Sequence, residues 1–556
     1  MIIAVLTSSM LLTVLLIPAL IKYAVPLKLV DLPNERKVHI HAIPRVGGIA
    51  MVLGVLLPLF VLMPEGSTKY GILAAFATIF LFGIWDDRGD LNYKLKFLGQ
   101  FLASIFVVVI GDVSIRWVPF LDATPLPDWI SFPVTIFCLL AITNAIAISD
   151  GLDGLTGGSS LLSFIMLGAL AFVAEDMLSI IIAISVIGSI LGFLRYNAHP
   201  AIIFMGDTGS QFLGFSLGTV SILLTQHTYT AISPVFPVLL LGSPIIDTAW
   251  VMISRVMAGT SPFKADKNHI HHRLLSLGLT HFEVVVLIYL THIIFISSAF
   301  YFRFAADVYL LFVFVTITAA VVGGLFALQR TTWQKNNKVL SHDVNKNTII
   351  IFVNNFLVRQ AIKKTYYCTE KIFSSNITYL FIPLLLFCLS LNLNNLEIDL
   401  FILCILLFLA SFCALIFSGK NLQFDKVSMY VFAALIAYLS YKKGYINDNI
   451  KYFDFIYMAC LGVLLFFYIV FIYKQGMENK QFKINPTDIL IALLVLILPL
   501  LTLVYHENLF ITIAMVKFVI FIYLFEIVLV EQRNVKSVQF FITLLMGIVS
   551  VKTLFG

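Results

Sequence analysis

Long apolar runs separated by short polar segments fill the first 330 of the 556 residues of this chain. A helix of about 20 apolar residues crosses the hydrocarbon core of a bilayer, and short or tilted helices need somewhat fewer. This template predicts about eleven spans, near 2–21, 46–63, 71–85, 97–111, 130–148, 161–174, 177–194, 210–226, 234–254, 283–301 and 307–328. The period-2 alternation of a membrane β-barrel is absent from these runs, so we expect every span to be a helix.

The amino-acid composition of the chain changes after residue 330. Residues 331–376 are polar and rich in lysine and asparagine, which predicts a cytoplasmic linker. An additional membrane region of six or seven helices is predicted within 377–556, from apolar runs near 377–391, 399–418, 427–440, 453–473, 487–505, 508–530 and 537–555. The predicted fold class is therefore all-α, a polytopic integral membrane helical bundle with its core in residues 1–330 and a second region of unknown function.

Composition agrees with this prediction. Apolar residues make up 60% of the chain and charged residues 12%, with a mean hydropathy of +0.99, which excludes a soluble, disordered or secreted disulfide-rich protein. The six cysteines lie mostly within apolar runs and are interpreted as small buried side chains. Because basic residues of a membrane protein set its topology, the net charge of +6 does not indicate a nucleic-acid partner, and none is expected.

Lysine and arginine are concentrated in alternate loops. One set of loops contains Lys22, Lys28, Arg36, Lys37, Arg45, Arg88, Lys94, Lys96, Arg195, Arg255, Lys264, Lys267 and Arg273. The opposite set contains only Lys69, Arg116 and Arg303. The positive-inside rule therefore places the first set in the cytoplasm and the N-terminus outside.

Five polar stretches in the predicted cytoplasmic loops carry the candidate chemistry. The first, DLPNERKVHIHAIPRVGG, contains Arg45 and suits either topological anchoring or a basic rim for phosphate groups. The second, GIWDDRGDLNYKLKFLGQ, has Asp86 and Asp87 at the end of one predicted helix and Lys96 at the start of the next. Adjacent carboxylates repel each other, so the pair suits a metal or base site as well as a solvated turn.

The third stretch, TNAIAISDGLDGLTGGSS, places Asn144, Asp150 and Asp153 among glycines. Glycine allows a ligand to approach the backbone, and these side chains supply hard oxygen ligands, which is more than a plain turn requires. The fourth, RYNAHPAIIFMGDTGSQFLG, has Asn197 and then Asp207 entering a predicted helix. A helix N-terminus of small residues favours an anion, and Asp207 beside it suits Mg²⁺; simple N-capping by Asp207 is the alternative.

The fifth stretch, SPFKADKNHIHHRLLSLG, is rich in imidazole and cationic side chains, with candidate ligands His269, His271, His272 and Arg273. Three histidines in four residues suggest zinc, but no cysteine lies nearby and the neighbouring charges are positive. We therefore expect this stretch to contact phosphate or diphosphate in preference to zinc.

In this order and on one face, the five stretches resemble the polyprenyl-phosphate N-acetylhexosamine-1-phosphate transferases of the WecA, TagO and MraY type, with IFMGDTGS and HIHHRLL the most specific parts. The resemblance covers about residues 1–330. It implies transfer of an N-acetylamino-sugar 1-phosphate, by default that of N-acetylglucosamine, from a UDP-sugar to undecaprenyl phosphate, with UMP leaving. The lipid-linked product would initiate a surface polysaccharide such as O-antigen or teichoic acid. A bacterial cytoplasmic (inner) membrane, a cytoplasmic active site and a homodimer would suit the family.

The resemblance also implies roles for individual residues. Asp207 would be the main ligand of Mg²⁺, with Mn²⁺ as an alternative ion, and Asp150 a second ligand. Asp86 and Asp87 would position or deprotonate the lipid phosphate, or assist the metal. Substrate contacts would come from Arg45, Lys96, Asn144, Asp150, Asp153, Asn197, His269, His271, His272 and Arg273.

One position departs from the family pattern. The family usually has a second asparagine three residues after the first in the third stretch, and here that position is Ala147. This departure, with the additional helices, motivates an alternative in which the protein is a catalytically weak binder of UDP-sugar or lipid phosphate in a glycan-assembly complex. A secondary transporter is suggested by span number alone, but crowding of polar groups on one face argues against midplane sites.

Overall fold

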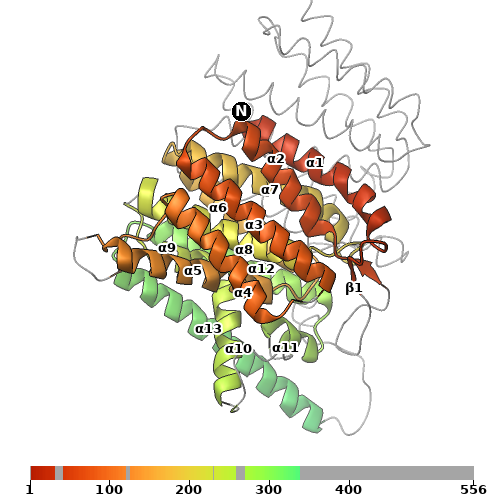
Figure 1. Ribbon diagram of the computed structural model, residues 1–556. Helices are drawn as coiled ribbons and strands as arrows, with labels where there is room; N and C mark the ends of the chain where they lie inside the picture. Colours follow the sequence, from red (N-terminus) through yellow and green to blue (C-terminus); the bar gives the residue numbers. More distant parts are fainter. Residues whose placement is uncertain are drawn as a thin grey trace, which may run out of the picture. The chain divides into compact units, whose positions relative to one another are not determined.

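The computed structural model describes residues 2–31, 42–89, 91–119, 125–228, 231–257, 259 and 269–338, and this part of the chain is almost entirely helical (Figure 1). Its helices are α1 (Ile2–Tyr23), α2 (Gly47–Leu62), α3 (Ser67–Gly89), α4 (Tyr93–Ile105), α5 (Asp128–Ile148), α6 (Leu155–Val173), α7 (Met177–Asn197), α8 (Gly206–Ile222), α9 (Phe236–Leu240), α10 (Gly242–Met257), α11 (Ile270–Ser276), α12 (His281–Phe302) and α13 (Asp307–Lys338). π-Helical turns extend α4 and α8, namely η1 (Phe106–Ile110) and η2 (Leu223–Thr228). One antiparallel pair joins β1 (Val30–Asp31) to β2 (Ile43–Pro44).

The helical membrane class predicted from the sequence is confirmed. Within the described residues, eight helices are long and apolar enough to cross a bilayer: α1, α3, α4 with η1, α5, α6, α7, α12 and α13. α2 is a shorter apolar helix of 16 residues, and α8 has 17 residues before η2 begins. α13 continues as a helix to Lys338, into the segment predicted as a linker, whereas the rest of that segment and the predicted region 377–556 lie outside the described residues.

The single span predicted at 234–254 is wrong, because the structure divides it into α9 and α10. In one continuous helix, the ring of Pro244 would clash with the carbonyl of Leu240 and remove a hydrogen bond. The break at Leu241 places Pro244 in the first turn of α10, where proline is tolerated. Gly242, at the start of α10, lies so close to the Phe295 ring that a Cβ there would be 2.4 Å from it. α10 consequently runs across the direction of most other helices (Figure 1).

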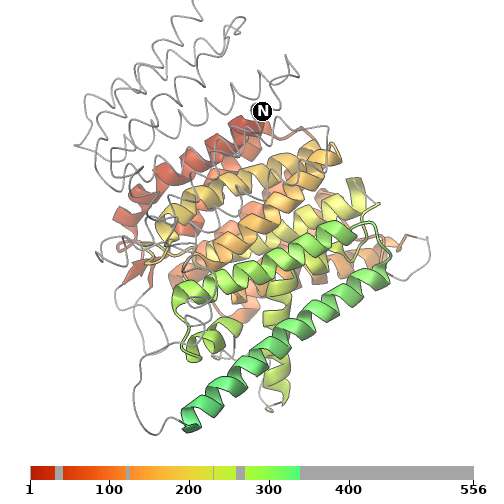
Figure 2. The ribbon, with the colours of Figure 1, turned by 180° about the vertical axis from the view of Figure 1, so that it is seen from behind.

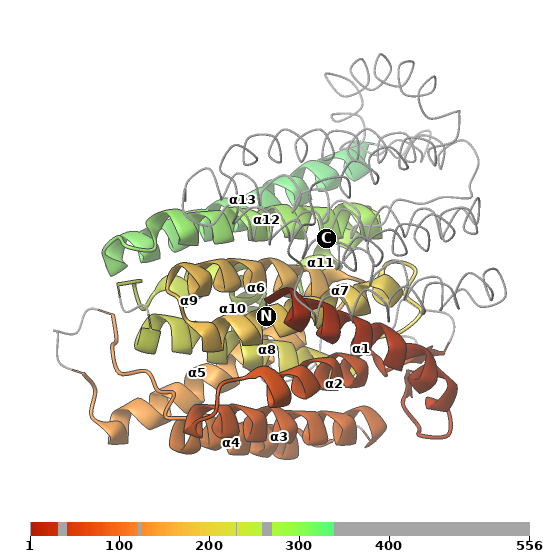
Figure 3. The same ribbon diagram turned by 90° about the horizontal axis from the view of Figure 1, so that it is seen from above.

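Helix α8 is the centre of the bundle. Every residue from Thr208 to Ile222 is buried, and α8 packs against α2, α3, α5 and α6. Glycines permit this close approach, because a Cβ at Gly83 would lie 2.6 Å from the Cα of Thr208 and one at Gly48 would lie 2.3 Å from the amide nitrogen of Gly209. α3 and α4 pack together at one side of this part of the chain and α12 and α13 at the other (Figures 2 and 3).

Backbone hydrogen bonds join the first polar stretch to the fourth. The amide of Phe204 donates to Pro44 (2.8 Å), and the amides of Gly47 and Gly48 donate to Phe204 (2.9 Å) and Met205 (3.0 Å). Because helices α1 to α8 alternate in direction along the chain, α3, α5 and α7 end where α4, α6 and α8 begin. The polar stretches between these helices therefore meet at one end of the bundle.

We expect Gly83→Ala to destabilise the protein by about 1–3 kcal/mol, because the added methyl group has no space against α8. Gly89→Ala is the matched control at the end of the same helix, where nothing lies within 4 Å of an added Cβ. The midpoint of thermal unfolding in detergent measures both. Equal midpoints for the two variants would contradict the close packing of α3 on α8.

Candidate active site

Asp87 fixes the N-terminus of α8. Its carboxylate accepts hydrogen bonds from the backbone amides of Asp207 (2.7 Å) and Thr208 (2.9 Å) and from the hydroxyl of Thr208 (2.5 Å). The Asp87 side chain comes from the last turn of α3 and is only 4% exposed. An acidic group at a helix N-terminus satisfies free amides and interacts favourably with the helix dipole. Asp87 therefore determines where the backbone of Asp207 lies.

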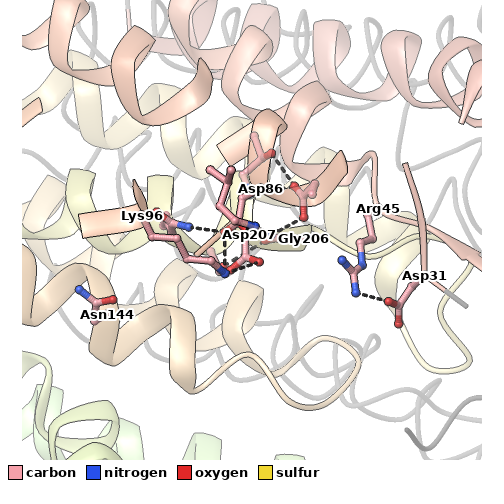
Figure 4. A network of polar contacts seen from close by, with 12 residues as sticks. Asp31, Arg45, Asp86, Lys96, Asn144, Gly206 and Asp207 are labelled. Atoms are coloured by element: carbon pink, nitrogen blue, oxygen red, sulfur yellow. Dashed lines mark hydrogen bonds and ion pairs between the residues drawn. The ribbon is translucent and has the colours of Figure 1, made fainter. Parts of the chain in front are cut away.

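Asp86, Lys96 and Asp207 form a charged cluster between α3, α4 and α8 (Figure 4). Lys96 Nζ lies 2.7 Å from Asp86 Oδ2 and 3.4 Å from Asp207 Oδ2. Asp86 is buried and also accepts a hydrogen bond from the amide of Leu91 (2.8 Å). The side chains of Lys96 and Asp207 are 32% and 34% exposed, so these two are the members of the cluster that a ligand can reach.

A chain of amides links this cluster to the third polar stretch. Gln100 accepts a hydrogen bond from Asn144 (2.7 Å) and donates one to Gln211 (3.1 Å), and Gln211 lies 3.4 Å from Asp86. Gln100 and Gln211 were not predicted as site residues. Both lie within predicted spans, where a polar side chain is unusual, and that signal could have identified them.

The loop between α5 and α6 carries Asp150 and Asp153. The pKa of the Asp150 carboxyl is raised to about 7, first by burial and then by the negative charges of Asp207, Asp153 and Asp87. Asp153 pairs with His199, whose Nδ1 lies 2.7 Å from Oδ2. The third and fourth polar stretches therefore come together at this loop.

The side-chain amide of Asn197 is hydrogen-bonded to two backbone groups of the protein. It accepts a hydrogen bond from the amide of Gly154 (2.8 Å) and donates one to the carbonyl of Ile203 (2.9 Å). Both contacts are buried. Asn197 thereby connects the start of α6 to the segment that leads into α8, and its predicted contact with substrate stays a prediction.

The three histidines of the fifth stretch lie against one another, with ring centroids 5.4 Å apart for His269 and His271 and 4.3 Å apart for His271 and His272. His269 Nδ1 lies 2.9 Å from Asp247 Oδ2 on α10. Asp247 was missed, although an acid within the predicted span 234–254 was a usable signal. Arg273 stacks over Trp250, with Cζ 4.8 Å from the ring centroid.

His271 connects this cluster to the α5–α6 loop. A Cβ on Gly151 would lie 2.2 Å from His271 Nε2, so the two residues are in close contact. Burial lowers the pKa of His271 to about 3, which keeps the ring neutral at pH 7. Its Nε2 has no hydrogen-bond partner among the residues described here. Arg45, by contrast, pairs with Asp31 beside the β1–β2 pair, to one side of the Lys96 cluster (Figure 4).

Comparisons with known proteins agree with the motifs. Residues 70–225 match glycosyl transferase family 4. A probable undecaprenyl-phosphate N-acetylglucosaminyl 1-phosphate transferase of Bacillus subtilis is 38% identical over 322 residues, 56% of this chain and 90% of the relative. The chain belongs to glycosyl transferase family 4. This membership confirms the resemblance to polyprenyl-phosphate hexosamine-1-phosphate transferases.

Two relatives of lower identity carry similar names. A decaprenyl-phosphate N-acetylglucosaminephosphotransferase of Mycobacterium leprae is 34% identical, covering 48% of this chain and 74% of the relative. An undecaprenyl-phosphate alpha-N-acetylglucosaminyl 1-phosphate transferase of Yersinia pestis is 31% identical, covering 48% and 75%. The family match includes the second, third and fourth polar stretches.

The residues of this family 4 site fit a divalent cation. Four carboxylates, those of Asp86, Asp87, Asp150 and Asp207, lie near one another, and Lys96 pairs with two of them. Burial and then the negative charges of Asp207, Asp153 and Asp87 raise the pKa of Asp150, and a bound cation would relieve the repulsion between these charges. The donors are hard oxygen atoms, which Mg²⁺ prefers.

Asp87→Ala is expected to destabilise the protein by about 2–3 kcal/mol, because the buried N-terminus of α8 loses hydrogen bonds to a charged acceptor. Asp87→Asn keeps an acceptor and should lose less. Asp207→Ala is the control, expected to stay within about 0.5 kcal/mol because it removes a partly exposed carboxylate. Thermal unfolding of the purified variants gives the comparison, and a normal midpoint for Asp87→Ala would refute the capping role.

Proposed function

We propose that this protein transfers N-acetylglucosamine 1-phosphate from a UDP-sugar to undecaprenyl phosphate, releasing UMP and forming the lipid-linked diphosphate sugar that initiates a cell-surface glycan. Family membership and the names of the relatives support this reaction. The structural observation that most directly supports the proposed reaction is the position of Asp207. This carboxylate is partly exposed at the N-terminus of a buried helix, held through its backbone by Asp87 and paired with Lys96.

In the reaction, an oxygen of the lipid phosphate attacks the phosphorus atom bonded to the sugar. The bond from that phosphorus to the oxygen bridging it to UMP breaks, and UMP leaves with that oxygen. Such a transfer requires mainly in-line positioning and neutralisation of charge. Asp207 and Asp150 would hold Mg²⁺, which supplies positive charge at the diphosphate. Lys96 adds a second positive charge beside Asp207.

Asp86 and Asp87 act in this proposal as positioning residues. Asp87 binds the α8 amides and Asp86 binds Lys96, so each carboxylate orients a group that faces the substrate. A phosphate monoester has a second pKa of about 6 and is already mostly a dianion at neutral pH. A strong general base is therefore unnecessary for the lipid phosphate.

The histidine cluster suits the donor phosphates. His271 Nε2 is buried and close to Gly151, beside the loop that carries Asp150 and Asp153. An imidazole nitrogen in this position can donate a hydrogen bond to a phosphate oxygen. His269, His272, Arg273, Asn144 and Arg45 remain proposed contacts to substrate.

We place the site on the cytoplasmic face of a bacterial inner membrane. The ends of the helices that carry the site belong to the loops richest in lysine and arginine, in agreement with the positive-inside rule. UDP-sugars are water-soluble, so a donor made in the cytoplasm would reach this face directly. A homodimer stays a prediction.

The test is release of UMP by the full-length protein in detergent, supplied with undecaprenyl phosphate, Mg²⁺ and a panel of UDP-N-acetylamino sugars. We expect turnover with UDP-N-acetylglucosamine that is abolished by removal of Mg²⁺. Asp207→Ala should lower the rate by at least about 100-fold, as expected for loss of a group that holds charge at the reacting phosphates. Asp128→Ala, an exposed aspartate at the opposite end of the bundle, is the matched control and should retain the rate.

Two outcomes would overturn the proposal. Wild-type activity in Asp207→Ala would show that Asp207 is not part of the reaction centre. Binding of UDP-sugars without UMP release from any of them would favour the alternative suggested by Ala147, a binding protein of a glycan-assembly complex.

A further inference from the structure

A second group of metal-binding side chains lies beside the transferase site. Asp153 in the α5–α6 loop, His199 after α7 and His281 at the start of α12 each offer one ligand atom, and these atoms lie within 4.8 Å of one another. The rings of His199 and His281 stack with centroids 4.1 Å apart and planes 17° apart. Three segments far apart in the sequence thus present two imidazoles and a carboxylate to one point.

The described part of the protein leaves the polar ring atoms of His281 unsatisfied. Both of its ring nitrogens are inaccessible to solvent, and neither has a hydrogen-bond partner among the residues that the structure describes. A buried polar atom without a partner costs about 1–3 kcal/mol. The ring lies against the Asp153–His199 pair, which supplies a carboxylate at 2.7 Å from His199 Nδ1. A metal ion would give His281 the partner that it lacks.

We propose that Asp153, His199 and His281 bind a divalent transition metal of the Zn²⁺ class. Two imidazoles and one carboxylate are ligands typical of Zn²⁺ sites, whereas Mg²⁺ selects oxygen donors. Tetrahedral ligands at about 2.1 Å from zinc lie about 3.4 Å apart, so the three side chains close around the ion by small rotations. These three ligands are different residues from Asp207 and Asp150, which are proposed to hold Mg²⁺.

The metal would hold three parts of the active site together. Asp153 belongs to the loop of Asp150, His199 to the segment that leads into α8 and Asp207, and His281 follows α11, which carries His271 and His272. An ion that closes such long loops replaces conformational freedom with fixed geometry. We therefore expect the metal to stabilise the fold as well as to order the site.

The test measures Zn²⁺ bound to the full-length protein, purified without a histidine tag and kept in excess Mg²⁺ to occupy the oxygen-rich site. Isothermal titration gives the affinity and elemental analysis the stoichiometry. Co²⁺ in place of Zn²⁺ gives absorption bands that report coordination by nitrogen and oxygen. We expect one Zn²⁺ per chain, and an increase in the midpoint of thermal unfolding when it binds.

His281→Gln and His199→Gln should each weaken Zn²⁺ binding by at least about tenfold, the lower end of what loss of even an outer-shell partner costs. His227→Gln is the matched control, because His227 is a histidine near the opposite end of α8, hydrogen-bonded to the amide of Ser114. Asp207→Asn should also retain Zn²⁺. Normal elution in size-exclusion chromatography identifies variants that fold.

Failure to bind Zn²⁺ at one ion per chain, or unchanged binding in both folded histidine variants, would overturn this inference. Loss of Zn²⁺ in Asp207→Asn would also overturn it, because the ion would then occupy the oxygen-rich site. UMP release is a separate measurement, so failure of the zinc site leaves the transferase proposal standing.

Discussion

The buried carboxylate of Asp87 at the N-terminus of α8 is the interaction on which the site depends. A charge 4% exposed is tolerated only when hydrogen bonds replace its hydration, and here two amides and a hydroxyl of α8 do so. The same contact requires glycine before Asp207, since Gly206 has φ +65° and a Cβ there would lie 2.4 Å from Asp87 Oδ1. One contact between α3 and α8 therefore fixes the helix start, the glycine and the direction of Asp207.

Around this contact, the buried side chains and the side chains accessible to substrate have different functions. Asp86 and Gln211 are buried and bond to other side chains, whereas Lys96 and Asp207 are about one third exposed. The buried members hold the reachable ones in place, so substrate meets side chains whose orientation is already determined. Such preorganisation is what electrostatic catalysis of phosphoryl transfer requires, because no reorganisation is needed as charge moves.

Sequence patterns predicted the helical class and the grouping of the five polar stretches at one face. They could do so because the bilayer constrains both the hydropathy of a span and the charge of a loop. They could not distinguish Asp86 from Asp87, which are adjacent in sequence but bond to different helices. The break at Leu241 was missed because apolar residues continue through it, although Pro244 marked it. Asp247 and Gln100 were missed because their partners, His269 and Asn144, lie 22 and 44 residues away, although a polar side chain within a predicted span marked each of them.

Ala147 can be considered in the light of the amide chain. Asn144 lies one turn before Ala147 on α5, and its amide bonds to Gln100 and to the carbonyl of Leu140. Gln100 in turn reaches Gln211, so in the described part of the chain the amide network between α4, α5 and α8 is complete without a second asparagine. Alanine at this position leaves no internal partner unsatisfied. We therefore expect alanine at this position to affect contact with ligand, and hence turnover, more than stability.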